Sequence, residues 1–445
     1  MATLMVGVSG VRGIVGQSLT PTVALEFAQA YGTLLNGGRV VLARDTRPSG
    51  PMFEAAATAG LLAAGCRVTQ LGVAMTPTIG HAIQTGGYDA GMSITASHNP
   101  QAWNGLKFLD SRGLAPAPQR AAEIAAIRRE GRYRLVEQGF VEPVQDSSAG
   151  QRHVEAVLAA CEVDLKPLRG MKVVLDCING AGCRHTPGFL RALGCEPIVL
   201  NGEPTGQFAH TPEPVCENLG DLCRAVREHR AAVGFAQDPD ADRLAIVDER
   251  GEYIGEEYTL ALAVRFVLGH RPGPVAANLS TSRMIDDIAA AHGVRVFRTP
   301  VGEAHVARRM IAEGCVIGGE GNGGVIDPRV CYVRDSLSAM SLVLQLLAET
   351  RQRISELVGS IPAYVAVKEK YEAPRERIDA AVEAVTRAYA DRKPNTADGV
   401  RVDFPEGWVH LRASNTEPIV RIIAEGRTES AARRLISEVR SAAGL

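Results

Sequence analysis

Hydrophobic positions along this chain follow two different periods. Short apolar runs such as Arg39–Ala43 and Lys172–Asp176 are typical of buried strands. Between such runs, apolar residues recur every three or four positions, as Val23, Phe27 and Tyr31 do, and this spacing predicts helices. Strands that alternate with helices in this way favour parallel α/β layers.

One junction between helix and strand recurs along the chain. A predicted helix ends in glycine and is followed at once by a predicted strand, at Gly65, Gly194, Gly293 and Gly314. Glycine adopts the left-handed conformation of a helix C-terminus at little energetic cost. The recurrence predicts three related α/β domains, although βα units resemble one another in any fold.

The length of 445 residues exceeds what one compact core usually holds, so we expect several domains. After residue 363 the pattern changes to a strand, a helix over about 375–392 and a hairpin of two runs, 400–404 and 408–411, which predicts a small α+β domain. The predicted domains are 1–150, 151–250, 251–363 and 364–445. The fold class is therefore α/β, with three related α/β domains and a C-terminal α+β domain.

Composition and net charge exclude some classes of binding partner. Hydrophobic residues make up 46% and charged residues 22% of the chain, as in ordinary globular proteins, and the formal net charge is −2. The chain has no excess of basic residues that could attract nucleic acid or an acidic membrane, so we expect neither as a partner. Nine scattered cysteines without a CxxC pair, and an uncharged N-terminus without a long apolar run, predict a cytoplasmic protein.

The stretch Thr95–Pro100 is the first candidate for chemistry. It follows a predicted strand, and we expect its serine, Ser97, on an exposed turn. His98 is a candidate proton acceptor beside the hydroxyl, and Lys107 is a candidate cation for a transferring phosphoryl group. The alternative is that Ser, His and Asn are ordinary turn formers.

Three carboxylates at alternate positions, Asp238, Asp240 and Asp242, leave another predicted strand. They can converge on one hard cation, and oxygen-only ligation favours Mg²⁺ over zinc. An EF-hand loop is excluded because its obligatory glycine position holds Arg243. A charged turn without a cation is disfavoured, since one pair of like charges near 4 Å costs about 4 kcal/mol at an effective dielectric of 20.

Three further loops carry candidate binding groups. Ser9–Gly13 is predicted to be a glycine-rich loop that presents Arg12. Gly318–Gly324 places Glu320 and Asn322 where they suit hydroxyl or amine groups, unless the loop is only a tight turn. The last domain carries a set of residues suited to grip a phosphate, with an ordinary turn between surface arginines as the alternative: Arg412, Ser414, Asn415, Thr416 and Arg421.

In this order along the chain, the motifs resemble those of the α-D-phosphohexomutase superfamily, which includes phosphoglucomutase/phosphomannomutase and phosphoglucosamine mutase. Arg44–Gly50 and Asp176–Gly182 add to the resemblance, which covers essentially the whole chain. It implies four domains with mixed sheets around a central cleft, a phosphorylated serine and one Mg²⁺ ion per chain. It also implies interconversion of 6-phospho- and 1-phosphosugars through a bisphosphate intermediate, with a sugar bisphosphate as activator and a monomeric or dimeric enzyme.

The resemblance assigns roles to matching positions. Ser97 would be the phosphoserine and, with Asp238, Asp240 and Asp242, a metal ligand. The other implied roles are the following: Arg12, His98, Lys107 and Arg243 around the transferring group; Glu320 and Asn322 on sugar hydroxyls; Arg412, Ser414, Asn415, Thr416 and Arg421 on the non-reacting phosphate.

The chain departs from its relatives at Gly324, where many of them have a histidine, so a proton-transfer role for that histidine has no counterpart here. The form of the loop around it is most similar to phosphoglucosamine mutases and favours glucosamine phosphate, whereas the Ser414–Pro418 stretch also suits phosphomannomutases. Two other classes stay open. A magnesium-dependent sugar phosphatase would use Asp238 as nucleophile, although its motif continues to Thr or Val rather than Asp242, and a non-catalytic sugar-phosphate sensor would have no need of Ser97.

Overall fold

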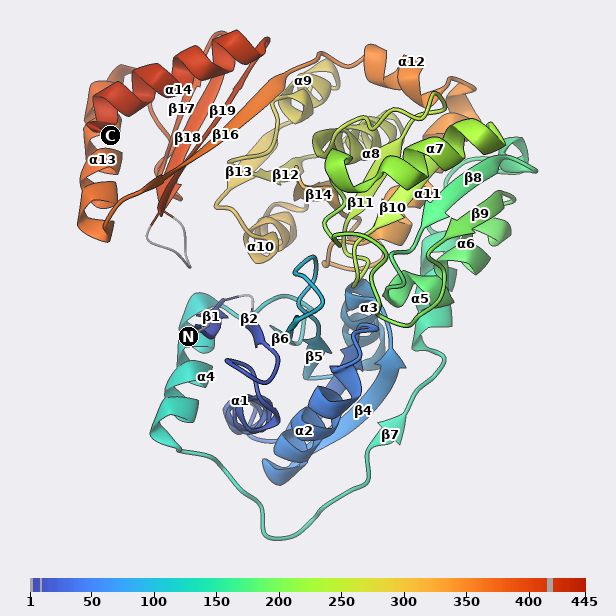
Figure 1. The fold of residues 1–445 in the computed structure, drawn as a ribbon, viewed down its shortest axis with the longest axis vertical. Coiled ribbons are helices and arrows are strands. Elements are labelled where there is room, and N and C mark those ends of the chain that lie inside the picture. Colours follow the sequence, from blue (N-terminus) through green and yellow to red (C-terminus); the bar gives the residue numbers. More distant parts are fainter. Residues whose placement is uncertain (1–2, 9, 414–418) are drawn as a thin grey trace.

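The computed structural model describes residues 3–8, 10–413 and 419–445, which fold into four units that each contain one β-sheet. We call them the first to the fourth unit in chain order. Figure 1 shows that they follow one another along an arc, from the blue first unit through the green second and yellow-orange third to the red fourth.

The first unit holds a seven-stranded mixed sheet in the order β1-β2-β6-β5-β3-β4-β7. Thr20 caps the first helix by accepting a hydrogen bond from the Val23 amide, and Pro21 begins that helix. Its elements are β1 (Met5–Gly7), β2 (Gly10–Ile14), α1 (Pro21–Leu34), β3 (Gly38–Arg44), α2 (Gly50–Ala63), β4 (Cys66–Val73), α3 (Thr76–Gly86), β5 (Ala90–Ile94), β6 (Trp103–Leu109), α4 (Pro118–Glu130) and β7 (Val144–Gln145).

The second unit holds a four-stranded sheet in the order β11-β10-β8-β9. Its elements are α5 (Ala149–Ala159), η1 (Lys166–Leu168), β8 (Lys172–Asp176), η2 (Ala181–Arg184), α6 (Thr186–Ala192), β9 (Glu196–Leu200), η3 (Cys216–Asn218), α7 (Gly220–His229), β10 (Val233–Gln237) and β11 (Leu244–Val247), where η marks a 3₁₀ helix.

The third unit holds a four-stranded sheet in the order β13-β12-β14-β15. Its elements are α8 (Glu256–His270), β12 (Val275–Asn278), α9 (Met284–Ala291), β13 (Val296–Thr299), α10 (Glu303–Glu313), β14 (Ile317–Glu320), β15 (Gly324–Ile326), α11 (Ser336–Thr350) and α12 (Ile354–Gly359).

The first three units repeat one topology. In each, three strands pair in parallel and a fourth pairs antiparallel at one side of the third, as β6 does with β5, β11 with β10 and β15 with β14. The glycines that end the preceding helices have positive φ, for example 98° at Gly194 and 63° at Gly314. The prediction of three related α/β units is confirmed.

The fourth unit is an antiparallel sheet in the order β16-β19-β18-β17, covered on one face by helices. The helix predicted over about 375–392 ends at Ala388 and a 3₁₀ turn follows. The elements are β16 (Val365–Glu372), α13 (Arg375–Ala388), η4 (Ala390–Arg392), β17 (Val400–Phe404), β18 (Gly407–Ala413), β19 (Ile419–Gly426) and α14 (Glu429–Ala443).

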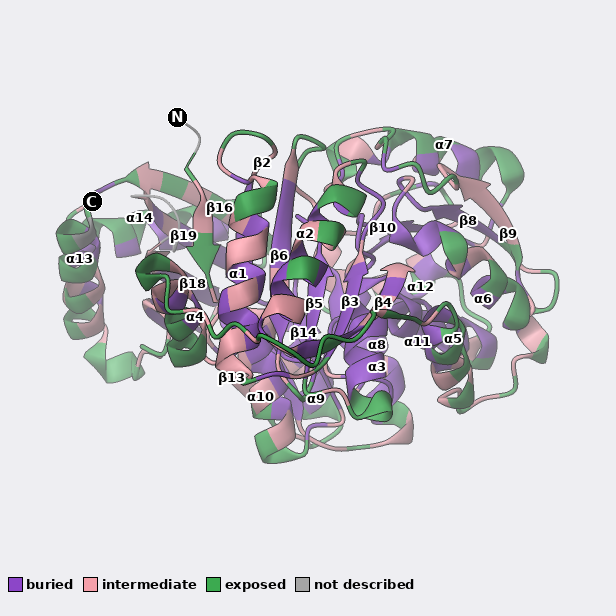
Figure 2. Ribbon diagram, turned by 90° about the horizontal axis from the view of Figure 1, so that it is seen from below, coloured by how far each residue is buried: buried purple, intermediate pink, exposed green. Residues whose placement is uncertain are grey.

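The hydrophobic clusters show which units are packed together. One cluster joins apolar side chains of the first three units, including Ile79 of α3, Phe235 of β10 and Leu260 of α8, whereas the fourth unit packs around a cluster of its own. Figure 2 shows the buried strands inside and exposed residues on outer helices such as α4 and α13. Loops of the first three units are therefore fixed relative to one another by a shared core.

The structure corrects one sequence expectation near the start of the chain. The residues Gly10–Gly13 do not form a glycine-rich loop, because they belong to β2, which pairs antiparallel with β6. Gly10 has a φ of 116°, and a Cβ there would lie 2.0 Å from the Leu106 carbonyl oxygen, so glycine permits this close pairing.

All nine cysteines are free and six are buried. The described part of the chain holds no helix with the length and apolar character needed to span a bilayer.

Candidate active site

Three loops in equivalent places of the three related units carry the candidate residues. The loop between β5 and β6 holds Ser97, the loop between β10 and β11 holds the three aspartates, and the loop between β14 and β15 follows Glu320. Each contains a left-handed residue, with φ of 51° at Ser97, 56° at Ala241 and 85° at Gly323. Non-glycine residues in this conformation are strained and concentrate at functional sites.

The structure brings Ser97 to the aspartates across a long sequence separation. The Ser97 hydroxyl donates a hydrogen bond of 3.0 Å to Oδ2 of Asp238 and lies 3.3 Å from Nδ1 of His98. We call Asp238, Asp240 and Asp242 the acidic centre, since one oxygen from each lies within 4.8 Å of the others. The predicted exposure of Ser97 is wrong, because the residue is only 1% exposed.

A buried arginine shapes the Ser97 loop. Arg47 is fully buried and donates to the carbonyl oxygens of Ser97 at 2.6 Å, Asn99 at 2.7 Å and Pro100 at 2.8 Å. Its charge is balanced by Asp45, whose Oδ2 lies 3.0 Å from Nε. Sequence reasoning did not assign Arg47 to the site, although the Arg44–Gly50 motif was the available signal.

The three carboxyls of the acidic centre are buried close to one another, and this changes their pKa values. Burial, and then the neighbouring Asp242 and Asp240, raise the pKa of Asp238 well above its ordinary value. Burial also opposes ionisation of Asp240 and Asp242, yet Lys107 and, for Asp242, Arg334 hold the pKa of these two carboxyls below the ordinary value. The centre thus depends on cations from other elements.

The donor set of the acidic centre fits a magnesium ion. Oδ1 of Asp240 and Oδ1 of Asp242 are buried and have no hydrogen-bond partner among the described residues. Buried polar atoms are almost always paired, so these oxygens mark places where a cation would be bound. All candidate ligands are oxygens, including the Ser97 hydroxyl, which is the set that Mg²⁺ prefers.

The predicted basic residues surround the same centre. Nζ of Lys107 lies 2.5 Å from Asp240 and 3.2 Å from Asp242, and Nε of Arg243 lies 3.9 Å from Asp242. Arg12 donates to Asn99 in the Ser97 loop at 3.1 Å. Burial, and then the positive charges of Arg243 and Arg12, lower the pKa of His98 to about 3, so its imidazole is neutral and adds no charge.

Arg334 joins the acidic centre to the loop after β14. It lies just before α11 and donates to Asp242 at 2.7 Å and to Oε2 of Glu320 at 3.0 Å, and it approaches Glu303 at 3.3 Å. A side chain at Gly324 would clash with it, because a Cβ there would lie 2.1 Å from Cδ of Arg334. Sequence reasoning missed Arg334, since nothing local to Val333–Asp335 indicates its partners.

The two predicted sugar-binding residues differ in whether other groups of the protein already hydrogen-bond to their side-chain oxygens. Oε1 of Glu320 accepts from the side chain of Asn278 at 2.8 Å and from the Gly302 amide at 2.9 Å, so this carboxylate is held in place. Oδ1 of Asn322 is buried without a hydrogen-bond partner among the described residues. Asn322 therefore has acceptor capacity left for a ligand.

Strand register brings the arginines of the fourth unit together. Arg412 on β18 and Arg421 on β19 are directly paired, and Lys370 on β16 pairs with Arg421. We call Lys370, Arg421 and Arg412 the cationic row; it lies on the sheet face opposite the core that packs Leu411 and Ile422. Like charges paired across strands repel, which an anion would relieve. Ser414, Asn415 and Thr416 lie outside the described residues.

The fourth unit docks against the third through polar contacts. The Arg283 amide donates to Glu425 at 2.9 Å, the Ser280 hydroxyl lies 2.8 Å from Nδ1 of His410, and Arg401 donates to the Leu279 carbonyl. Asp398 accepts from the Val301 amide at 3.0 Å and pairs with Nε of Arg412 at 3.0 Å. The interface thereby orients one arginine of the cationic row.

Comparison with known proteins accounts for this arrangement. Models of phosphoglucomutase/phosphomannomutase match in order along the chain: α/β/α domain I at 3–134, domain II at 151–251, domain III at 255–364 and the C-terminal domain at 363–442. The chain belongs to the phosphoglucomutase/phosphomannomutase family. It is an enzyme of the isomerase class, a phosphosugar mutase of the α-D-phosphohexomutase superfamily. Magnesium and a phosphoserine are typical of this family.

Individual relatives agree with the family assignment. A protein of Methanopyrus kandleri described as "Probable phosphoglucosamine mutase" is 43% identical, over 97% of this chain and 96% of its own length. The crystal structure of a phosphoglucomutase/phosphomannomutase family protein from Burkholderia thailandensis has a TM-score of 0.86 at 28% identity, and the match covers 98% and 97% of the two chains. N-acetylphosphoglucosamine mutase from Aspergillus fumigatus, solved with GlcNAc-6P and magnesium, shares the fold at a TM-score of 0.55 and 17% identity, over 92% and 78% of the chains.

Proposed function

We propose that this phosphohexomutase interconverts hexose 6-phosphate and hexose 1-phosphate through a phosphorylated Ser97 and a sugar bisphosphate, with glucosamine phosphate as the preferred substrate. The observation that carries the proposal is the hydrogen bond between the Ser97 hydroxyl and Asp238, within a ring of acidic and basic side chains from three units. The relatives described as phosphoglucosamine mutases support the choice of sugar.

Charge balance explains why these residues are gathered. A phosphoserine adds a charge of about −1.5 to −2 to the three carboxylates of the acidic centre. One Mg²⁺ ion, held by Ser97 and the three aspartates, would stabilise the charge that spreads over the phosphoryl oxygens. Lys107, Arg12 and Arg243 add positive charge at the same place, while neutral His98 can hydrogen-bond the serine oxygen without altering that charge.

In the forward half-reaction the phosphoryl group leaves Oγ of Ser97 and bonds to the free sugar hydroxyl, whose proton ends on Oγ of Ser97. In the second half, the other phosphoryl group of the bisphosphate returns to Oγ of Ser97, and the proton of that hydroxyl ends on the sugar oxygen that the phosphoryl group leaves. The sugar has to turn over between the two steps, so one site must grip whichever phosphate is idle. Arg412 and Arg421 are our assignment for that grip, together with Ser414, Asn415 and Thr416 of the intervening turn.

Glu320 and Asn322 are assigned to the sugar hydroxyls. Glu320 is fixed by Asn278, Gly302 and Arg334, which gives it the rigidity that positioning requires. Separation of the fourth unit from the third would let the bisphosphate reorient, and closure would keep water from the phosphoserine.

The test is Ser97→Ala, assayed with the 1-phosphates of glucosamine, mannose and glucose in the presence of a sugar bisphosphate activator. We expect no turnover, with the fold retained in circular dichroism, because alanine keeps the same backbone and removes only the hydroxyl. Substantial mutase activity in the variant would exclude the covalent role. The wild-type assay ranks the three sugars, and a preference for mannose or glucose phosphate would overturn the choice of glucosamine.

A phosphatase that uses Asp238 as nucleophile makes a different chemical prediction. Oδ1 of Asp238 already accepts from the amides of Asp242 at 3.0 Å and Arg243 at 3.1 Å, and Oδ2 accepts from Ser97. We therefore expect the phosphate on the enzyme to survive acid, as phosphoserine does, whereas an aspartyl phosphate would be hydrolysed.

A further inference from the structure

A cavity lies at the other end of the second unit from the acidic centre. Its volume is about 920 Å³, and its lining includes Lys172, at the start of β8, and Ala232, just before β10. The acidic centre follows the opposite end of β10, a strand of five residues that spans about 17 Å. Helix α11 likewise begins beside the acidic centre, where Ser336 donates to the Ala241 carbonyl, and ends at this cavity.

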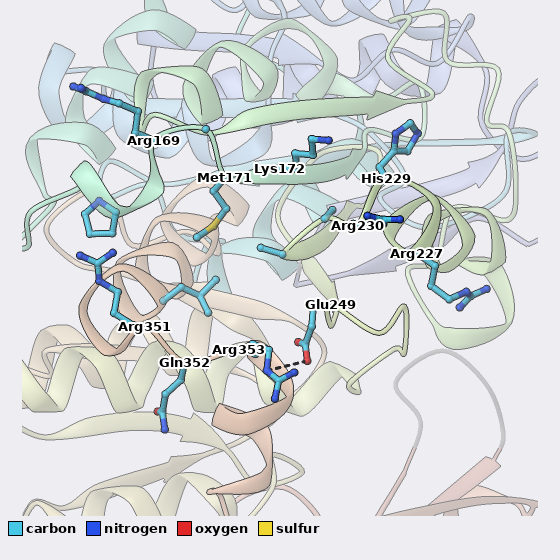
Figure 3. Close-up of a pocket in the computed structure, with 15 residues that line it drawn as sticks. Arg169, Met171, Lys172, Arg227, His229, Arg230, Glu249, Arg351, Gln352 and Arg353 are labelled. Atoms are coloured by element: carbon cyan, nitrogen blue, oxygen red, sulfur yellow. Dashed lines mark ion pairs between the residues drawn. The ribbon is translucent and has the colours of Figure 1, made fainter.

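The lining of the cavity is strongly cationic. Figure 3 shows Lys172, His229 and Arg230 of the second unit on one side of the cavity and Arg351 and Arg353 of the third unit on the other, with Glu249 between them. Glu249 is the single carboxylate in the lining; it accepts hydrogen bonds from the amide and hydroxyl of Ser355 and lies 4.0 Å from Nε of Arg353, so it offsets part of the charge of that one arginine. Six permanent cations line the cavity of a protein whose net charge is −2: Arg169, Lys172, Arg227, Arg230, Arg351 and Arg353.

The helix C-termini at this cavity explain only some of the basic residues that line it. Basic residues near helix C-termini interact favourably with the helix dipole, and α7 and α11 both end here. Arg227 also donates to the Gly251 carbonyl at 3.0 Å, and Arg353 pairs with Glu356. Lys172, however, comes from the start of a strand, and Arg169 follows the three-residue 3₁₀ helix η1, which is too short to have a large dipole; both residues are exposed at the cavity.

The backbone gives a second, independent indication. Six of the described α-helices end in a left-handed residue, and in four of them that residue is glycine: Gly87, Gly131, Gly314 and Gly444. The other two are Arg230, with a φ of 51°, and Arg351, with a φ of 59°. Both line this cavity. Glycine is the stabilising residue at such positions, so stability alone does not account for either arginine.

We infer that this cavity binds a small organic anion that carries two or more phosphate groups. Arginine and lysine side chains from two units can each donate to phosphate oxygens, and the volume is that of a small-molecule site. Met171 and Leu347 contribute apolar surface to the same lining, which suits a flat apolar body such as a nucleobase. The proposed ligand class is therefore a nucleotide with at least two phosphates.

The experiment is calorimetric titration of the full-length protein with ATP and, separately, with inorganic tripolyphosphate, in buffer without magnesium. The test variant is Arg230→Gly/Arg351→Gly, because glycine suits both backbone positions and the fold will be retained. The matched control is Lys393→Gly, which removes a cation from another left-handed position, the end of η4 in the fourth unit, away from the cavity.

We expect one ATP per chain, binding at least about tenfold weaker to the double variant and unchanged to Lys393→Gly. We expect mutase activity to be the same in all three proteins, so the result is independent of the mutase mechanism. No ATP binding at millimolar concentration, or binding that the double variant leaves intact, would overturn the site. Tripolyphosphate that binds as tightly as ATP would overturn the organic part of the ligand.

Discussion

The acidic centre and the cationic row are opposite in charge and also in setting. The three aspartates are at most 1% exposed and lie where loops of three units with a common core meet. The cationic row lies on the open face of a sheet whose unit has its own core, with Lys370 exposed. The acidic centre is thus held by a shared core, which suits its proposed role as the reaction point, whereas the row belongs to a unit with a separate core, which suits its proposed role of binding and releasing a phosphate. We therefore expect a substitution in the acidic centre to lower kcat and a substitution in the cationic row to raise KM.

The largest effect is expected for Asp240→Asn in the acidic centre. We expect kcat to fall by at least about 100-fold, because a charged oxygen ligand for the cation is lost. The unfolding temperature should fall modestly: the amide keeps the shape of the side chain, but Lys107 loses one of its two carboxylate partners and keeps Asp242. A coupled mutase assay and thermal unfolding measure the two quantities. A kcat within about tenfold of wild type would contradict the cation site.

Arg334→Met tests how the acidic centre is held against the third unit. Removal of the guanidinium leaves Asp242 with Lys107 as its nearest cation and Glu320 with only neutral donors, so we expect the free energy of unfolding to fall by about 3–5 kcal/mol. Arg334→Lys keeps the charge and serves as the control, with a smaller loss. Urea denaturation gives both values, and equal stability of wild type and Arg334→Met would show that the contacts are not structural.

Arg421→Ala tests the cationic row. A charge-assisted hydrogen bond to phosphate is worth about 1.5–3 kcal/mol, so we expect KM for the sugar phosphate to rise by roughly 10- to 100-fold. Arg433→Ala, which removes an exposed arginine of α14 that pairs with Glu429, is the matched control and should leave KM unchanged. Unchanged KM and kcat in Arg421→Ala would remove the phosphate-binding assignment.

The smallest effect is expected at the exposed end of the row. Lys370→Ala should raise KM about two- to fivefold at low ionic strength, and the difference should shrink in about 0.5 M salt, because exposed charges are screened. Lys393→Ala, which removes an exposed lysine elsewhere in the fourth unit, is the control. The same KM for Lys370→Ala and wild type at low salt would limit the row to the two arginines.

These contrasts show where sequence reasoning succeeds. The fold class and the strand positions follow from short-range patterns, and the β10–β11 loop was recognisable because three carboxylates at alternate positions have few other uses. The strand β2 was misjudged as a loop, since its glycines indicate flexibility in sequence but allow close strand pairing in the structure. Ser97 was expected on the surface because the motif does not reveal that Arg47 holds the loop inside.

The order of elements, the repeated helix–strand junctions and the candidate reactive side chains could be predicted from the sequence alone, because they depend on residues within one or two turns of each other. The tertiary structure decided which groups meet. Ser97 contacts Asp238 across 141 positions, Arg334 joins Asp242 to Glu320, and Lys370 lies beside Arg421 through strand register. Such contacts are set by how sheets pack and pair, and a one-residue change of register would turn every side chain to the other face.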